Sequence, residues 1–405
     1  MAWSDSCSGA FEKWADEVGD DNFKFDTVSK YYRKSMNFTP PANTRFTNAT
    51  PSYNPALVSQ GGPLDVTYPA YANSWTTWVA VAMEAIGIKN TDSFINGALN
   101  GSAWHTNTIN HTTGIRVEVT VSGNSYTLKA NKEVIVAGGV FQSPQLLQVS
   151  GVGPAALLKN LKVPVVADRP GVGQNLNDQI FFGVSYRVNI QTTSTLSKGE
   201  AAAISVEDFK VNATGFLTTP GETLKTLATF PADWPEVEYL VIPNFVGDLA
   251  TSPAPTDNYN YATLLSALMT PTSLGNVSII SSKMSDKPLI NPNWLTTQSD
   301  IDVSIAMFKR LRDAWTVPEL KEKLTIGDEY YPGANVKTDE DIEKFIRSSM
   351  IPVSHASATC KMGKESDDIA VVDSHGKVFG VKSCAWFCPP IAPVLDSTSR
   401  RLTLK

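Results

Sequence analysis

The sequence is poor in charge and has no long apolar run. Charged residues make up 18% of its 405 residues, and the 34 Lys and Arg residues form no basic block against 40 Asp and Glu. The net charge of −6 therefore disfavours a nucleic-acid partner or an anionic membrane surface. No stretch reaches the roughly 18 apolar residues that a membrane span requires, so no membrane association is expected. With 42% hydrophobic residues, the composition is that of a folded globular chain of roughly two or three domains.

Cysteine is also scarce, which excludes a disulfide framework in a chain of this length. The four cysteines are Cys7, Cys360, Cys384 and Cys388. The first residues show no basic region followed by an apolar core, so no secretory signal is predicted in this chain. Six Asn-x-Ser/Thr sequons nevertheless suggest an ancestor in the secretory pathway, although a chain rich in these residues produces some by chance. They are Asn37, Asn48, Asn100, Asn110, Asn212 and Asn276.

Hydrophobic periodicity predicts a mixture of helices and short strands. Two short helices are expected within residues 1–40, and further helices at 75–86, 300–315 and 339–348. A hairpin is expected over 117–130, turning at Gly123-Asn124. More sheet is expected between Phe181 and Val246 and at 261–269, 277–281 and 288–291. No repeat or low-complexity tract is present.

The segment from Glu133 to Gly151 is the most informative. Glu133–Ala137 is predicted to be a buried strand that leads into Gly138-Gly139. Ser143 suits a helix N-cap with Pro144 at the first helical position. Such a unit directs free backbone N–H groups toward the carboxyl end of the strand, where α/β sheets bind ligands. A second helix at 154–161 and a strand at 163–166 should follow, and then the loop 169–175.

Other motifs are absent or weak. Gly151–Ala156 formally matches the dinucleotide pattern G-x-G-x-x-A, but it follows a helix and contains Pro154, so we reject it. No G-x-S-x-G, H-E-x-x-H or Walker A motif occurs. A zinc set of Cys360, His375, Cys384 and Cys388 is disfavoured by its atypical C-x₃-C step and single histidine. A nucleophile and base pair of His355 and Cys360 is likewise the weaker alternative to a structural role.

Residues Gly138–Gly153 resemble the second signature of the glucose–methanol–choline (GMC) oxidoreductases. The resemblance continues through Asp168–Asp178 in the loop that follows this signature. It covers nearly the whole chain in family order and is strongest to fungal alcohol- and sugar-oxidising members. Further matching segments are Gly61–Val66, Ser273–Val277, Pro288–Asn293, His355–Gly363, Val371–Asp373 and Val378–Val381.

The resemblance implies an FAD-dependent oxidoreductase that acts on CH–OH groups of a small-molecule alcohol or sugar. It implies a mixed α/β and α+β fold, with an incomplete Rossmann-like FAD-binding lobe interleaved with an antiparallel-sheet substrate lobe flanked by helices. The expected division is an N-terminal remnant with lid and substrate-side segments (1–114), a partial FAD-binding lobe (115–185), a substrate lobe (186–345) and a return to the FAD-binding lobe (346–405). Oligomeric state is left open.

Four residues are the predicted flavin-lining positions: Gly138, Gly139, Asn175 and Asp178. They lie at the end of the predicted strand and in the loop that follows the signature. Ordinary turn chemistry is the alternative explanation for each of them. No metal ligand and no catalytic residue is assigned.

The chain departs from the family pattern in three places. It contains no N-terminal strand–GxGxxG–helix, and Thr113–Arg116 runs directly into Val117 where relatives have a further segment. After Ser383 the family sequence leading to the proton-abstracting histidine is replaced by Cys384-Ala385-Trp386-Phe387. A frame change or a mis-called splice site after Ser383 is our hypothesis for this tail. One nucleotide sequence can encode Cys-Ala-Trp-Phe in one reading frame and Leu-Arg-Val-Val, which the family has at this place, in the adjacent frame.

These departures leave two other functions open. One is a non-catalytic remnant that folds as a small-molecule-binding lobe without flavin. The other is a flavin-independent lyase or cyclase that reuses the fold. His355 is not promoted to the catalytic base, because its segment is not the one that carries the family's proton-abstracting histidine.

Overall fold

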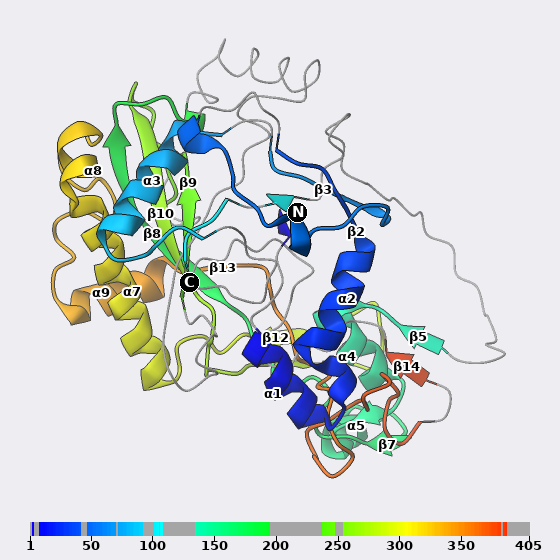
Figure 1. Ribbon diagram of the computed structural model, residues 1–405. Coiled ribbons are helices and arrows are strands. Elements are labelled where there is room, and N and C mark those ends of the chain that lie inside the picture. Colours follow the sequence, from blue (N-terminus) through cyan, green and yellow to red (C-terminus); the bar gives the residue numbers. More distant parts are fainter. Residues whose placement is uncertain are drawn as a thin grey trace.

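The computed structural model describes residues 2–3, 8–41, 47–69, 72–91, 101–104, 106–107, 134–194, 237–247, 254–381 and 384–386. Their elements form two groups, which occupy the upper left and lower right of Figure 1. The predicted hairpin over 117–130 lies outside the described residues, as do His105, His111, Cys7 and Cys388.

An antiparallel sheet forms the centre of the first group. Its strand order is β13 (Ile351–Pro352), β8 (Ile180–Val188), β10 (Asn260–Leu268) and β9 (Val237–Ile242). In the centre of the sheet Leu264 lies opposite Val184 on one side and Val241 on the other. Because both faces of β10 are covered, the strand is buried along nearly its whole length. An antiparallel sheet is thus present, as predicted, although β13 and most of β8 lie outside the residues 186–345 that were expected to form it.

Helices cover one face of this sheet. α7 (Gln298–Thr316) packs on β10 and β8, and α3 (Ser74–Ala85) and α8 (Pro318–Lys323) lie beside it. Trp75 of α3 stacks on Trp315 of α7 with ring centroids 4.7 Å apart, and the Trp315 indole N–H donates to the Val184 carbonyl at 3.2 Å. Burying an indole N–H without a partner costs free energy, and this bond removes that cost for Trp315. This pair therefore ties the helix layer to the sheet.

α9 (Asp339–Ser349) packs against α7 and begins at a capping box. The Thr338 hydroxyl accepts from the Asp341 N–H, while the Asp341 carboxylate accepts from the Thr338 N–H. These two bonds satisfy donors that would otherwise be unpaired at the helix start. The helices predicted at 75–86, 300–315 and 339–348 are confirmed within a residue or two at their ends.

The second group contains α1 (Ser8–Val18), α2 (Phe25–Ser35), α4 (Gly139–Val149) and α5 (Ala155–Asn160). Two short parallel sheets join it: β5 (Val134–Val136) with β14 (Cys384–Trp386), and β6 (Val152–Gly153) with β7 (Ala167–Asp168). Its apolar core includes Leu147, Val172 and Cys360. The two helices predicted within residues 1–40 are α1 and α2.

Smaller pairs complete the described fold. They are β1 (Ala2–Trp3) with β4 (Thr106–Asn107), β2 (Met36–Phe38) with β3 (Leu64–Val66), and β11 (Asn276–Ser278) with β12 (Leu289–Asn291). The described residues also include three short 3₁₀ helices: η1 (Asp21–Phe23), η2 (Thr47–Ala49) and η3 (Pro55–Leu57). In the described ranges no helix has the length and apolar character needed to cross a bilayer.

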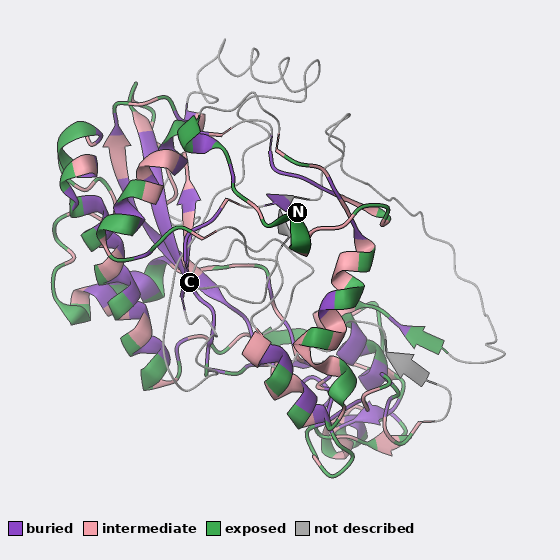
Figure 2. Ribbon diagram, in the orientation of Figure 1, coloured by how far each residue is buried: buried purple, intermediate pink, exposed green. Residues whose placement is uncertain are grey.

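The prediction of a buried strand at 133–137 was wrong about burial. Val134 and Ile135 of β5 are 52% and 59% exposed, as the exposed colouring of this strand shows (Figure 2). Parallel sheets are normally covered on both faces. Among the described residues β5 pairs with β14 alone, and the side chains of Val134 and Ile135 stay exposed.

Two further predictions were wrong. The helix after Gly138 does not begin at Ser143 and Pro144, because α4 starts at Gly139 and carries Pro144 inside it. The expected strand at 163–166 is absent, and a strand appears instead at Ala167–Asp168, where the chain pairs with β6.

Candidate functional site

The start of α4 is an open corner at the carboxyl end of β5. Gly138 is its N-cap, with no side-chain hydrogen bond to the cap, and Gly139 has a φ of +72°. A Cβ added at Gly139 would meet no described atom within 4 Å, so the helix start faces open space. The first turn of a helix carries N–H groups without intrahelical partners and the positive end of the helix dipole. This corner can therefore receive an anionic or carbonyl-bearing edge of a ligand.

Thr359 stabilises α4 from outside. Pro144 has no N–H, so it cannot donate to the Val140 carbonyl as a residue four positions later normally does. The Thr359 hydroxyl donates to that carbonyl instead, at 2.6 Å. The Thr359 carbonyl in turn accepts from the Gly173 N–H at 2.8 Å. Thr359 thus connects the helix start to the loop that follows the family signature.

Gln148 fixes the same loop from the other end of α4. Its buried carboxamide donates to the Val172 carbonyl at 2.9 Å and accepts from the Ile279 N–H at 2.9 Å. Gly173 lies beside it with a φ of +85°, and a Cβ there would come within 2.0 Å of the Val277 carbonyl oxygen. A residue with a side chain cannot take this place without moving the backbone. The loop therefore has a defined position relative to α4.

Asn175 and Asp178 both carry buried polar atoms. Asn175 has a φ of +60°. Its Nδ2 atom and the Oδ1 atom of Asp178 are buried and have no hydrogen-bond partner among the described residues. Such atoms are rare in native proteins and call for a partner. They fit a polar group supplied by a bound molecule.

The other oxygen of Asp178 accepts from the Trp294 indole N–H at 3.2 Å. Burial raises the pKa of Asp178 from 3.8 to about 6, although this bond and the Gln179 backbone N–H act in the opposite direction. Asp178 is 8% exposed. A carboxyl group in such surroundings keeps its proton to a much higher pH than in water.

The structure brings only some of the four predicted flavin-lining residues together. Gly138 and Gly139 form the helix start, and Thr359 ties that start to Gly173, two residues before Asn175. Asp178 instead lies where Asn177 pairs with Ser357 and Trp294 approaches. Thr359 and Gln148 were not singled out from the sequence. The signal for Thr359 was Pro144, because a proline inside a helix leaves a carbonyl that needs another donor.

The structure describes the surroundings of the dinucleotide-like motif and of part of the zinc set. The helix after Gly151–Ala156 is α5, and its Ala155 N–H donates to the Asp168 carboxylate at 2.9 Å. A carboxylate already at that helix start excludes a pyrophosphate there. For zinc, Cys360 is buried and His375 is exposed. In the part of the chain that the structure describes, no three His, Cys, Asp or Glu residues gather in a metal-binding arrangement.

Comparison with known proteins identifies the family. Two family models, both described as GMC oxidoreductase, match residues 105–181 and 271–384. A glucose-methanol-choline family oxidoreductase of Annulohypoxylon moriforme, mfmG, is 42% identical over 441 positions, covering 95% of this chain and 73% of that protein. A patulin synthase of Aspergillus clavatus is 39% identical, covering 94% and 70%. The chain belongs to the GMC oxidoreductase family.

The alignments also contain gaps in this chain. The match to mfmG extends over 441 positions, whereas the chain has 405 residues. Some positions of that relative therefore have no counterpart here.

A solved structure shares the fold. Formate oxidase of Aspergillus oryzae, in a variant studied for FAD modification, superimposes with a TM-score of 0.84 at 20% identity, covering 98% of this chain and 78% of that one. The mixed α/β architecture with its antiparallel sheet is thus the fold of that protein.

Proposed function

We propose that this protein is an FAD-dependent oxidoreductase that oxidises CH–OH groups of small-molecule alcohols or sugars. The observation that carries the proposal is the open corner between β5 and α4, at Gly138 and Gly139, in a chain of GMC ancestry. FAD, when bound, supplies a two-electron acceptor for the substrate carbon. The corner fits such a group, because nothing described fills the space in front of Gly139.

Four residues are proposed to hold the cofactor. The backbone N–H groups at Gly138 and Gly139 would donate to its polar edge, as helix starts do for anions. Asn175 would contribute its unpartnered Nδ2 as a donor. The unpartnered Oδ1 of Asp178 would accept a hydrogen bond, or donate one below a pH of about 6 when the carboxyl carries its proton.

The interleaved domain arrangement is part of the proposal. An FAD-binding lobe would take residues 115–185 and 346–405, and a substrate lobe residues 186–345, with 1–114 contributing lid and substrate-side segments. The parallel pairing of β5 with β14 supports this division, because it joins a strand near residue 135 to one near residue 385. The antiparallel pairing of β9 with β10 supports the substrate lobe, because both strands lie within residues 186–345.

A flavin titration tests the proposal. The purified protein is mixed with increasing FAD, and bound flavin is followed by the quenching of its fluorescence. Gly139→Glu places a carboxylate in the open corner and should weaken FAD binding at least about tenfold, a change of roughly 1.4 kcal/mol. Gly327→Glu is the matched control, since Gly327 has a φ of +74° and equally open surroundings.

The proposal fails if FAD does not bind the unmodified protein. It also fails in its assignment of the corner if both glutamate variants bind FAD as tightly as the parent. A protein that folds but takes up no FAD would instead match the non-catalytic remnant. Product formed from substrate without any electron acceptor would indicate the lyase or cyclase alternative.

A further inference from the structure

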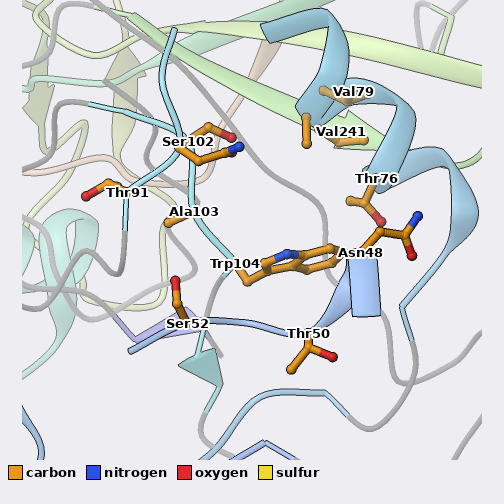
Figure 3. A pocket seen from close by; sticks show the side chains of 12 residues that line it. Asn48, Thr50, Ser52, Thr76, Val79, Thr91, Ser102, Ala103, Trp104 and Val241 are labelled. Carbon is orange, nitrogen blue, oxygen red and sulfur yellow. The ribbon is translucent and has the colours of Figure 1, made fainter. Parts of the chain in front are cut away.

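A cavity of about 230 Å³ lies beside α3, on the helix-covered side of the sheet. Thr76 and Val79 of α3 and Val241 of β9 form one side of it, and Figure 3 shows Trp104 and Ser102 facing them. Because α3 and β9 belong to the core of the antiparallel sheet, the cavity is separate from the corner at α4, which belongs to another core cluster.

The described lining of the cavity consists of neutral side chains. Among the described residues that line it there is no Asp, Glu, Lys, Arg or His. Hydroxyl and carboxamide side chains alternate there with small apolar ones. A charged ligand would lose its hydration in such a site without gaining a partner of opposite charge. The lining therefore selects a neutral molecule that can form hydrogen bonds.

Trp104 gives the cavity a flat wall. Its indole is partly buried against the apolar cluster of Met36, Phe38, Val66 and Tyr68, which holds the ring in place. In Figure 3 the indole lies between Thr76 of α3 and Thr50 on the opposite side. A fixed aromatic ring presents a large apolar face at little entropic cost. It suits a ligand ring that stacks on it.

The polar side chains that line the cavity differ in how far they are exposed to solvent. Thr76 and Ser102 are 7% and 6% exposed and lie at the inner end, together with Val79 and Val241. Asn48 and Asn90 are exposed and lie at the mouth. The volume is smaller than the roughly 300–1,000 Å³ of sites for drug-sized ligands, so it suits a single ring.

We propose that this cavity is a binding site for a neutral single-ring compound that carries hydroxyl groups. The ring stacks on Trp104, and its hydroxyl groups meet the side chains at the inner end and the carboxamides at the mouth. An aryl alcohol and a simple sugar share this chemistry. The site requires no flavin, so it is independent of the cofactor corner.

Saturation-transfer NMR on the full chain, without added FAD, tests the proposal. The probes are 4-hydroxybenzyl alcohol, methyl glucoside and 4-hydroxybenzoate. We expect transfer to one or both neutral probes and at least about tenfold weaker binding of the anion. A signal from the aryl alcohol alone, or from the glucoside alone, shows which of these two classes of compound the cavity binds. No transfer to either neutral probe, or equal binding of 4-hydroxybenzoate, overturns the proposal.

Two variants locate the binding. Ala80→Phe fills the cavity from α3, and Trp104→Ala removes the flat wall; each should weaken the neutral probe about tenfold. Val81→Phe is the matched control, because Val81 is 43% exposed on the same helix and does not line the cavity. Unchanged binding in both cavity variants overturns the assignment.

A measurement on the unmodified protein covers the case in which a variant fails to fold. Hydroxyl-radical oxidation followed by peptide mass spectrometry reports the accessibility of Trp104. The bound neutral probe should reduce oxidation of Trp104 several-fold and leave that of Tyr31, which is 67% exposed on α2, unchanged. Equal oxidation of Trp104 with and without a bound probe contradicts this location.

Discussion

Replacing Asp178 with asparagine should stabilise the protein, and more so at higher pH. In the folded protein the pKa of Asp178 is raised from 3.8 to about 6 by burial. The folded state therefore binds the proton more tightly than the unfolded chain. Stability is highest below the unfolded pKa and is lost as the pH rises toward and through 6. Well above pH 6 the ionised side chain costs about 3 kcal/mol of unfolding free energy.

Asparagine carries no charge at any pH and can still accept the Trp294 N–H through its amide oxygen. The variant should exceed the parent in stability by about 1.5 kcal/mol at pH 5 and about 3 kcal/mol at pH 8. Urea unfolding followed by tryptophan fluorescence, at intervals between these pH values, measures the difference. Asp368→Asn, at an exposed aspartate, controls for the lost negative charge. A stability difference for Asp178→Asn that is constant across this range, or of the opposite sign, refutes the reasoning.

Three further stability changes can be measured by urea unfolding. Thr359→Val should cost about 1–2 kcal/mol, because it removes the donor to the Val140 carbonyl, and Thr359→Ser should cost less; equal costs would contradict the role given to the hydroxyl. Glu329→Gln should cost about 3 kcal/mol, since Glu329 is bonded through both oxygens to Arg312 at 2.7 and 2.8 Å and is 9% exposed. Its control Glu343→Gln, from an exposed pair, should cost less than about 0.5 kcal/mol, and similar losses in both would count against the argument. Gly139→Ala should cost about 1 kcal/mol because its φ is +72°, and a neutral or stabilising effect would show that α4 starts differently.

Long periodic elements were predictable from the sequence. The helices α7 and α9 carry apolar residues at helical spacing and polar caps at their starts, so their positions follow from local rules. The strand β10 consists mostly of apolar residues and was found within one residue of its expected ends. In these segments local preference and tertiary packing favour the same structure.

The start of α4 shows where local rules failed. Ser143 followed by Pro144 is typical of a helix start, yet the helix begins five residues earlier. The reason is tertiary, because Thr359, more than two hundred residues away in sequence, donates to the carbonyl that Pro144 leaves without a donor. The exposure of Val134 and Ile135 was equally hidden, since an apolar run reads the same whether or not further strands cover it.

The position of Gly138 and Gly139 at the start of a helix was predictable from the sequence, whereas their role in holding flavin stays a prediction. The glycines at the end of β5 were found from the strand–glycine–helix pattern. Asn175 and Asp178 were found only through the family resemblance, and their buried unpartnered atoms became visible in the structure. The fixed position of the loop depends on Gln148, whose polar contacts join segments far apart in the chain. No local pattern encodes such contacts.

The absorption spectrum of the purified protein tests the central claim most directly. After incubation with FAD and removal of the excess, the account predicts a yellow protein with flavin bands in the near-ultraviolet and blue. These bands should bleach when an alcohol that it oxidises is added without oxygen. A folded, colourless preparation that retains no flavin would contradict it.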